Sequence, residues 1–503
     1  MGPRSTGAVC LALAAGSFVL AGLAAVLPSD PTGRAILAVL CGLVGVAWVG
    51  RYFAWRKRAV PSEFCGRLRV PKDAGPRLPR ELACTRHRRD EVAMSERSEF
   101  GMERVLSEAE GGVMRVRHLR VEGANREIGR TLAGVAVSRF GLRPEMLKEA
   151  RSGGGRMQAE YLRCHAPILW SRALGVADEL GVDPETHDVS TLPYNQAIDP
   201  FACSLVFYPP ESASTGHAMA SRNYDFPLVT MAQFAGSGEG ADGVRALMGD
   251  PYLLELRPTD GGYASLSMCS YDLLGGTLDG VNSEGLVVCV NGDEVAWGEG
   301  GHTAAGGVGF HELSCMRELL DSCATTREAH AILEGAEFYV GMIPCHYLVA
   351  DRTGAAFIFE RDRDGGGRFI DASREPTILT NHPLHRFPDR TTFPEPLGVA
   401  HTGTTSFERQ IRLEDAVREV EGRHTIDDMR SACESVLVGE VIGRLPDGPR
   451  KALASSPGTA RTLWHVLYDA TESTMDVRFY IGEVTVANGG FREQLGETLR
   501  LVV

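Results

Sequence analysis

The chain has 503 residues, a formal net charge of −13 and 44% hydrophobic residues. Its length exceeds one average domain but also fits a single large α/β unit with extensions, and the hydrophobic content is enough for a buried core. The negative charge argues against a nucleic-acid partner, which requires a basic surface. The twelve cysteines show no C-x-x-C pair and no regular spacing, which indicates neither a disulfide framework nor a zinc site and favours a reducing compartment.

The first 58 residues are predicted to form a transmembrane helical hairpin. Residues 7–27 carry no charge and are about long enough to cross a bilayer as a helix. A second, mostly apolar run covers residues 35–55, and a short turn separates the two runs. Arg4 precedes the first run and Arg56–Arg58 follows the second, so the positive-inside rule predicts a membrane protein whose large domain is cytoplasmic.

A cleaved secretory signal over residues 1–28 is the alternative, and it would make the protein secreted. Ala25–Pro28 lacks the Ala-x-Ala pattern of a cleavage site, and a second apolar run follows. The hairpin is therefore the favoured interpretation of this segment.

The folded part of the chain is predicted to begin at residue 113, after a charged linker over residues 59–112 with one helix around Glu103–Glu110. Strands are expected at residues 114–121, 203–208, 216–222, 252–257, 263–269, 285–291, 345–350, 355–360, 376–380, 461–469 and 475–482. Helices are expected at residues 122–137, 143–180, 310–337, 406–420 and 426–437. Strands, then helices, then strands again predict an α+β fold of stacked sheets covered by helices.

Cys203 lies at the start of an apolar run, and the next strand-like run ends in Ser-Arg-Asn-Tyr-Asp. Between the runs, residues 209–216 are rich in proline, serine and glycine, which is typical of a turn. The two runs should therefore form a hairpin that brings Cys203, Arg222 and Asp225 to one end of a sheet. A cysteine on an apolar strand is more often a core residue, so Cys203 alone does not indicate a functional site. The functional interpretation depends on its grouping with Arg222 and Asp225.

These residue types suit attack on an amide, which needs a nucleophile, a proton acceptor and donors for the oxyanion. If the peptide bond before Cys203 is cut, the new α-amine has a pKa of about 7.7–8.0 and lies next to the sulfur, where it can act as the base. Arg222 would stabilise the thiolate, and Asp225 would accept a hydrogen bond from the ammonium. Asn291, at the end of a strand, is a candidate oxyanion donor. A papain-like site using His311, His346 or His382 has no local signature.

Five short motifs occur in an order that resembles the linear-amide hydrolases. This group includes the choloylglycine hydrolases, penicillin V acylase and the isopenicillin-N acyltransferase-like peptidase family C45. The resemblance spans roughly residues 114–485. The motifs are Cys203, Ser221–Asp225, Asn282–Leu286, Thr380–Pro383 and Ser406–Arg409.

The resemblance implies a four-layer αββα Ntn-hydrolase sandwich in which residues 113–202 form a pro-region and residues 203–503 the catalytic chain. It implies that Cys203 is the nucleophile and, after cleavage from Ala202, the base through its own amine. It also implies roles for the other candidates: Arg222 and Asp225 hold the thiolate and amine, Asn291 and Asn381 serve the oxyanion and the amine, and Arg409 supports the network. Ala202 departs from the glycine common at this position in the acyltransferase branch.

The expected function is therefore hydrolysis or transfer of the acyl group of a linear amide through a thioester on Cys203. An acyl-CoA-dependent N-acyltransferase and a catalytically inactive, membrane-anchored binding module are the alternatives. Neither a metal nor a cofactor is implied, because protein groups supply the nucleophile, base and oxyanion donors. The expected partner is a small N-acyl amide, and the hairpin at residues 7–55 favours a lipidic one.

Overall fold

The chain divides into two compact units, Met1–Asp90 and Glu91–Val503, and every residue described in this computed structural model belongs to the second. The described residues are 97–98, 101–147, 154–187, 202–230, 246, 248–269, 274, 276–299, 307–340, 343–361, 365–394, 406–456 and 458–503.

The first sheet has ten strands within the described part of the second unit. In spatial order they are β1 (Arg97–Ser98), β2 (Gly101–Glu108), β3 (Arg115–Gly123), β6 (Tyr252–Pro258), β7 (Ser265–Cys269), β8 (Asp279–Asn282), β9 (Val287–Gly292), β10 (Cys345–Ala350), β11 (Ala356–Arg361) and β12 (Gly367–Asp371). Neighbouring strands are antiparallel except for the parallel pair β3 and β6. That parallel pair joins the segment before Cys203 to the segment after it.

The second sheet is antiparallel and contains the predicted hairpin. Its strands are β13 (Thr377–Leu379), β4 (Ala202–Tyr208), β5 (Met219–Pro227), β14 (Ala460–Asp469), β15 (Thr474–Thr485) and β16 (Phe491–Leu495), with β17 (Leu499–Val502) also paired to β15. Every residue of β4 and β5 is buried. Burial on both faces explains why the β4 sequence is almost continuously apolar instead of alternating.

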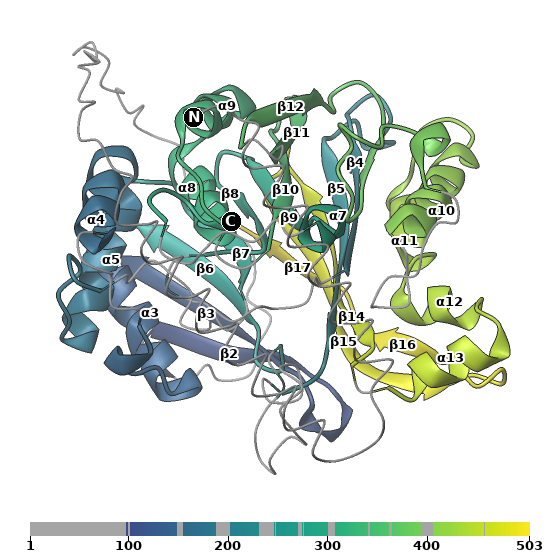
Figure 1. The fold of residues 1–503 in the computed structure, drawn as a ribbon, viewed down its shortest axis with the longest axis horizontal. Coiled ribbons are helices and arrows are strands. Elements are labelled where there is room, and N and C mark those ends of the chain that lie inside the picture. The colour runs from purple at the N-terminus through teal and green to yellow at the C-terminus, as the bar shows by residue number, and fades with distance from the viewer. Residues whose placement is uncertain are drawn as a thin grey trace, which may run out of the picture. The chain divides into compact units, whose positions relative to one another are not determined.

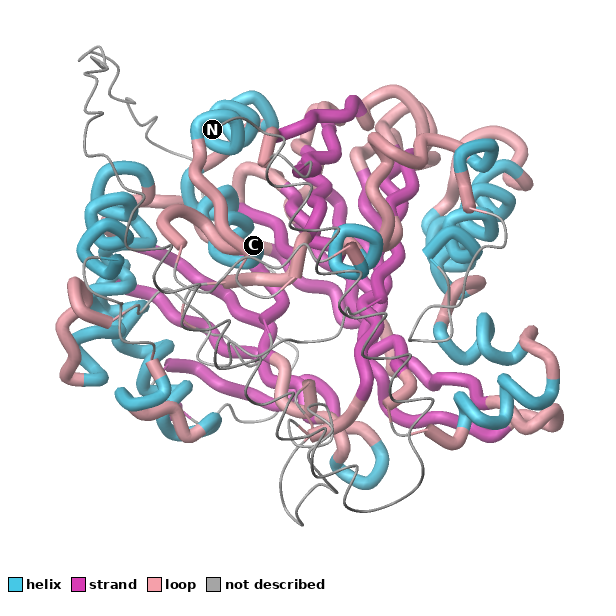
Figure 2. Tube along the Cα trace, in the orientation of Figure 1, coloured by secondary structure: helices cyan, strands magenta, loops and turns pink. Residues whose placement is uncertain are grey.

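Helices cover the outer face of each sheet (Figures 1 and 2). On the first sheet these are α3 (Asn125–Phe140), α4 (Gly154–His165), α5 (Pro167–Leu180), α8 (Glu312–Ser322) and α9 (Thr326–Gly335). On the second sheet they are α10 (Ser406–Arg418), α11 (Ile426–Glu434), α12 (Val438–Gly443) and α13 (Asp447–Ala454), while the short α7 (Glu294–Gly298) follows β9. Short 3₁₀ turns occur at Glu110–Gly112, Pro144–Met146 and Arg390–Thr392. Contacts of β4 with β9, and of β15 with β2, join the two sheets face to face.

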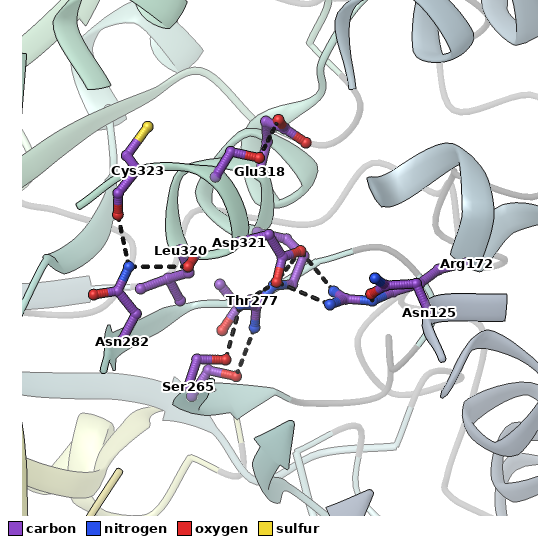
Figure 3. A network of polar contacts seen from close by, with 12 residues as sticks. Asn125, Arg172, Ser265, Thr277, Asn282, Glu318, Leu320, Asp321 and Cys323 are labelled. Carbon is purple, nitrogen blue, oxygen red and sulfur yellow. Dashed lines mark hydrogen bonds and ion pairs between the residues drawn. The ribbon is translucent and has the colours of Figure 1, made fainter. Parts of the chain in front are cut away.

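A buried network of hydrogen bonds and ion pairs connects α5 to α8 on the outer side of the first sheet (Figure 3). The guanidinium of Arg172 donates two hydrogen bonds to the carboxylate of Asp321, at 2.6 and 2.9 Å, and a third to Asn125 at 3.0 Å. Arg317 donates to the same carboxylate at 2.8 and 3.0 Å. Two buried cations therefore share one buried anion between a helix that precedes Cys203 and a helix that follows it.

The predicted α+β class is confirmed, while several predicted elements differ. The helix expected around Glu103–Glu110 is the strand β2, because pairing with β3 overrides the helical propensity of its charged residues. The strand expected at 216–222 lies at Met219–Pro227. Strands β1, β8, β12, β16 and β17 and helices α7, α12 and α13 were not predicted. Strand β8 is four residues long and contains aspartate, glycine and asparagine, which strands usually disfavour.

The predicted membrane localisation is corrected by the structure. A spanning helix needs about 20 consecutive, mainly apolar residues. Within the described ranges, no helix combines sufficient length with sufficient apolar character to span a bilayer. The longest, α3, has 16 residues and carries several charged side chains. The two predicted spans, residues 7–27 and 35–55, lie outside the described residues.

Candidate active site

The β4–β5 hairpin brings Cys203 and Arg222 together, as predicted. Antiparallel pairing places Cys203 opposite Tyr224 and Leu205 opposite Arg222. Because residues two apart share a face, the thiol and the guanidinium lie on the same side of the sheet. The Nη2 atom of Arg222 donates to the Sγ atom of Cys203 at 3.4 Å.

Arg222 is itself held by acceptors from the facing sheet. Its Nη2 atom also donates to the carbonyl oxygen of Val290 at 2.7 Å, and its Nη1 atom donates to a carboxylate oxygen of Asp279. The side chains of Arg222 and Asp279 are completely buried. Burial raises the pKa of the Cys203 thiol to about 12, although the positive charge of Arg222 opposes this rise. In the uncut chain the sulfur is therefore protonated at neutral pH.

Asn381 and Arg409 hold the backbone of Cys203. The Oδ1 atom of Asn381 accepts the backbone N–H of Cys203 at 2.9 Å and also accepts from Nη2 of Arg409 at 2.7 Å. Nη1 of Arg409 donates to the Cys203 carbonyl oxygen, and to the hydroxyl of Ser204 at 3.0 Å. The nitrogen that would become the amine after cleavage is thus already in contact with Asn381.

Asp225 lies opposite Ala202 in the β4–β5 pairing, at the peptide bond that precedes Cys203. One of its carboxylate oxygens accepts a hydrogen bond from Thr462 at 2.7 Å, while the other, Oδ2, has no partner among the described residues. Burial raises the pKa of Asp225 to about 6, against the opposing effect of Arg409. An additional donor at Oδ2 would stabilise the ionised form.

Asn291 lies on β9, beside the other candidates but with its amide group engaged. Its Nδ2 atom donates to the carbonyl oxygens of Leu379 and Thr380, each at 3.0 Å. Its Oδ1 atom is buried and has no partner within the described part of the chain. Donation to an oxyanion would require the exchange of one of these two hydrogen bonds. The next residue, Gly292, accepts from Nδ2 of Asn381 at 2.8 Å, which links Asn291 to the cluster.

The three histidines considered for a papain-like site have other partners. Nδ1 of His311 caps helix α8. Nε2 of His346 lies 2.8 Å from the carbonyl oxygen of Thr380, and Nδ1 of His382 lies 2.8 Å from the hydroxyl of Ser406. No hydrogen bond joins any of them to the Cys203 sulfur in the described residues.

Asp279 and Tyr468 belong to this cluster but were not identified as site residues from the sequence. Both are completely buried, and the Tyr468 hydroxyl donates to Oδ1 of Asp279. Asp279 could have been identified from the sequence, because it directly precedes the Gly-Val-Asn-Ser motif and an acidic side chain is unusual within a strand. A tyrosine within a strand is normally assigned to packing, so Tyr468 gave no such signal.

The cluster combines two buried cations with two buried carboxyl groups. The cations Arg222 and Arg409 lie with the carboxyl groups of Asp225 and Asp279, and all four side chains are completely buried. Paired charges of this kind tolerate burial, whereas a single one would not. Among the described residues, no group of three or more His, Cys, Asp or Glu side chains is placed to hold a metal ion. The arrangement suits nucleophilic chemistry at a thiol.

Two facing sheets covered by helices, with a cysteine held in a buried polar cluster, form the frame for comparison with known proteins. A family model described as acyl-coenzyme A:6-aminopenicillanic acid acyl-transferase matches residues 240–480, which confirms the resemblance predicted from the motifs. The chain is similar to this family over slightly less than half of its length. The matched segment includes Asn291, Asn381 and Arg409 but begins after Cys203, so it does not identify the nucleophile.

Three solved structures resemble the chain at low similarity. Penicillin V acylase from Agrobacterium tumefaciens is 18% identical, with 55% of this chain and 83% of that chain covered and a TM-score of 0.34. Two variants of conjugated bile acid hydrolase from Clostridium perfringens are each 12% identical, with 59% and 61% of this chain and 96% and 94% of the other covered, and TM-scores of 0.38 and 0.34. No curated protein matches the chain.

Proposed function

We propose that the chain is a self-cleaving cysteine Ntn hydrolase that transfers the acyl group of a linear carboxylic amide to water through a thioester on Cys203. The observation that carries the proposal is the environment of Cys203 at the start of a central strand. Arg222 contacts its sulfur, Asn381 its nitrogen and Arg409 its carbonyl oxygen. Three separate side chains thus orient one residue, which is more than a core cysteine requires.

Cleavage between Ala202 and Cys203 would change the chemistry of this residue. A peptide nitrogen is not a base, and the thiol of the uncut chain has a pKa of about 12. A free α-amine has a pKa of about 7.7–8.0, and its positive charge as an ammonium would lower the pKa of the adjacent thiol, so that the amine can take the thiol proton. The resulting ammonium would lie beside Asp225, whose open Oδ2 oxygen supports a role as its acceptor. Asn381 would retain its contact with the same nitrogen.

The reaction then proceeds in two steps, which are formation of the thioester on Cys203 and its hydrolysis. The thiolate of Cys203 attacks the amide carbonyl carbon, the C–N bond breaks, and the leaving amine takes the proton from the ammonium. Water, deprotonated by the α-amine, attacks the thioester carbon, and the C–S bond breaks to release the acid and restore the thiolate beside the ammonium. Arg222 stabilises the thiolate at the start and end of the cycle. We assign Asn291 to the oxyanion, through the exchange of one of its two hydrogen bonds.

An acyltransferase is the second candidate, favoured by the family that residues 240–480 match. In that case an amine, not water, attacks the thioester, and an acyl-CoA could supply the acyl group. Product analysis with and without an added amine acceptor separates the two candidates. Preference for a lipidic acyl chain rested on the predicted hairpin alone and forms no part of the proposal.

Intact-mass analysis of the purified chain and of a Cys203→Ala variant tests the proposal. We expect the wild type to contain a fragment that begins at Cys203 and to release acid from N-acyl amides, and the variant to remain uncut and inactive. Cys323→Ala, which removes another completely buried thiol, should behave like the wild type. Full amidase activity in Cys203→Ala would rule the mechanism out. A wild-type chain that is uncut and inactive would favour the binding module.

A further inference from the structure

The ion pair of Arg222 and Asp279 joins the two sheets next to Cys203. Asp279 projects from β8 of the first sheet, while Arg222 and Tyr468 project from β5 and β14 of the second. All three side chains are completely buried. Through Arg222, the pair contacts the sulfur of the candidate nucleophile at the interface between the sheets.

The geometry of the guanidinium explains why Asp279 matters for the sulfur. The five N–H groups of an arginine form a rigid planar fork, so fixing one nitrogen directs the others. Nη1 of Arg222 donates to Oδ2 of Asp279, and Nη2 then lies 2.7 Å from the Val290 carbonyl oxygen and 3.4 Å from the Cys203 sulfur. The carboxylate is held in turn, because the hydroxyl of Tyr468 donates to Oδ1.

We propose that Asp279, fixed by Tyr468, is a positioning residue that holds the guanidinium of Arg222 against the Cys203 sulfur and balances its charge. This inference rests on the proposed function, because it assigns a role in the same reaction. Without Asp279, Arg222 would keep the Val290 carbonyl and the sulfur as its acceptors among the described residues and would lose the one carboxylate that it contacts there. Such a cation would move to find another acceptor, because an unpaired buried charge is strongly unfavourable.

A merely structural ion pair between the sheets would give a different result from a positioning pair. Loss of a structural pair lowers stability and the fraction of folded enzyme, but it leaves kcat per folded enzyme molecule unchanged. Loss of Asp279 as a positioning residue also removes a negative charge beside the thiol, which lowers the pKa of the thiol and of the neighbouring amine. The charged and titratable groups that face this sulfur and guanidinium are Arg222, Asp225, Asp279, Cys289, Cys345, Arg409 and Tyr468.

The test is the pH profile of amide hydrolysis by Asp279→Asn. Asparagine keeps the shape of the side chain and one acceptor oxygen for Arg222, and the Tyr468 hydroxyl can reverse to accept from its amide. We expect kcat to fall about 10- to 100-fold with little change in KM, because the guanidinium loses its alignment. We also expect the acidic limb of the kcat/KM profile to move about one pH unit lower, because a nearby negative charge is lost.

Two tyrosine variants provide the matched comparison. Tyr468→Phe removes only the hydroxyl that holds Asp279, so kcat should fall by less than in Asp279→Asn, and the acidic limb should stay in place because the carboxylate remains. Tyr208→Phe is the control, since Tyr208 is equally buried and its hydroxyl has no hydrogen-bond partner among the described residues. It should match the wild type in both measurements.

The outcomes separate this inference from the proposed function. A wild-type chain that hydrolyses no amide overturns the proposed function and the inference with it. An active wild type together with an Asp279→Asn variant of equal kcat and unmoved acidic limb overturns the inference alone. A variant that loses activity only in proportion to its folded fraction, with the limb unmoved, also overturns it and shows a structural role.

Discussion

Asn381 is the residue on which the candidate site depends most heavily for its geometry. Its Oδ1 atom accepts from both the Cys203 nitrogen and Arg409, and its Nδ2 atom donates to Gly292 of the facing sheet. One amide thus connects the candidate nucleophile, a buried cation and the first sheet. Because a buried polar group without its partner is costly, all of these groups depend on this side chain.

Replacement of Asn381 by alanine should therefore impair function and stability together. We expect chain cleavage to stop or slow at least about 100-fold, because the Cys203 nitrogen and Arg409 lose their shared acceptor. The free energy of unfolding should fall by about 2–3 kcal/mol, since the groups that Asn381 satisfies stay buried. Intact-mass time courses and urea denaturation measure the two effects.

Asn488→Ala is the matched control for this variant. Asn488 is exposed, donates to the Gly443 carbonyl oxygen at 3.1 Å and accepts from the Gly490 nitrogen at 3.0 Å. Water can replace these partners at an exposed site, so its loss should cost about 1 kcal/mol or less and leave cleavage unchanged. Wild-type cleavage by Asn381→Ala would contradict the role assigned to this residue.

At the scale of elements, the packing of helix α3 on helix α5 depends on two glycines. A Cβ atom at Gly129 would lie 2.0 Å from the carbonyl oxygen of Arg172, and one at Gly175 would lie 1.9 Å from that of Arg126. Real Cβ atoms do not approach oxygen so closely. The backbones of the two helices therefore meet at these points, which sets the position of Arg172 toward α8.

Gly129→Ala should destabilise the protein by about 2–3 kcal/mol, because the helices must separate to accept the methyl group. The midpoint of urea unfolding measures this change. Gly335→Ala, at the end of α9, places its Cβ in open space and should be neutral or slightly stabilising, since alanine has the higher helix propensity. Equal stability of the two variants would show that the α3–α5 contact adjusts freely.

On the scale of the whole second unit, the segments before and after Cys203 contribute strands to the same sheet. Strands β1, β2 and β3 precede the proposed cut and continue the first sheet through the parallel pairing of β3 with β6. Gln158 exchanges two hydrogen bonds with the backbone of Gly309, at 2.8 and 2.9 Å. The buried pair of Arg172 and Asp321 adds a charged link between α5 and α8 (Figure 3). We therefore expect the two pieces to stay associated after cleavage.

Asp321→Asn tests the charged link in that association. The substitution leaves Arg172 and Arg317 buried without their shared anion, so stability should fall by about 3–5 kcal/mol. Size-exclusion chromatography of the cleaved protein in increasing urea should show the two pieces separating at a lower concentration than in the wild type. Separation of the wild-type pieces without denaturant would contradict the expectation of association.

Glu299→Gln provides the comparison for a surface pair. Glu299 and Arg386 are about one-third exposed and bond at 2.9 and 3.0 Å. Loss of such a pair should cost about 0–1 kcal/mol, because solvent screens both charges. Equal effects of Asp321→Asn and Glu299→Gln would mean that the buried network contributes no special stability.

The sequence alone determined the features that arise from short stretches of chain. Two strand-like runs and the turn residues between them predicted the β4–β5 hairpin that brings Cys203 and Arg222 together, because antiparallel register follows from local turn geometry. The ordered motifs also indicated a resemblance that the family match at residues 240–480 supports.

Only the tertiary structure decided how distant residues meet around Cys203. Asn381 and Arg409 are 178 and 206 positions from Cys203, and Tyr468 is 189 positions from Asp279. Which side chains meet across the interface depends on how two sheets pack face to face, and no local pattern encodes that packing. The same reason explains why β2 is a strand despite its helical sequence, since its partner β3 supplies the hydrogen bonds.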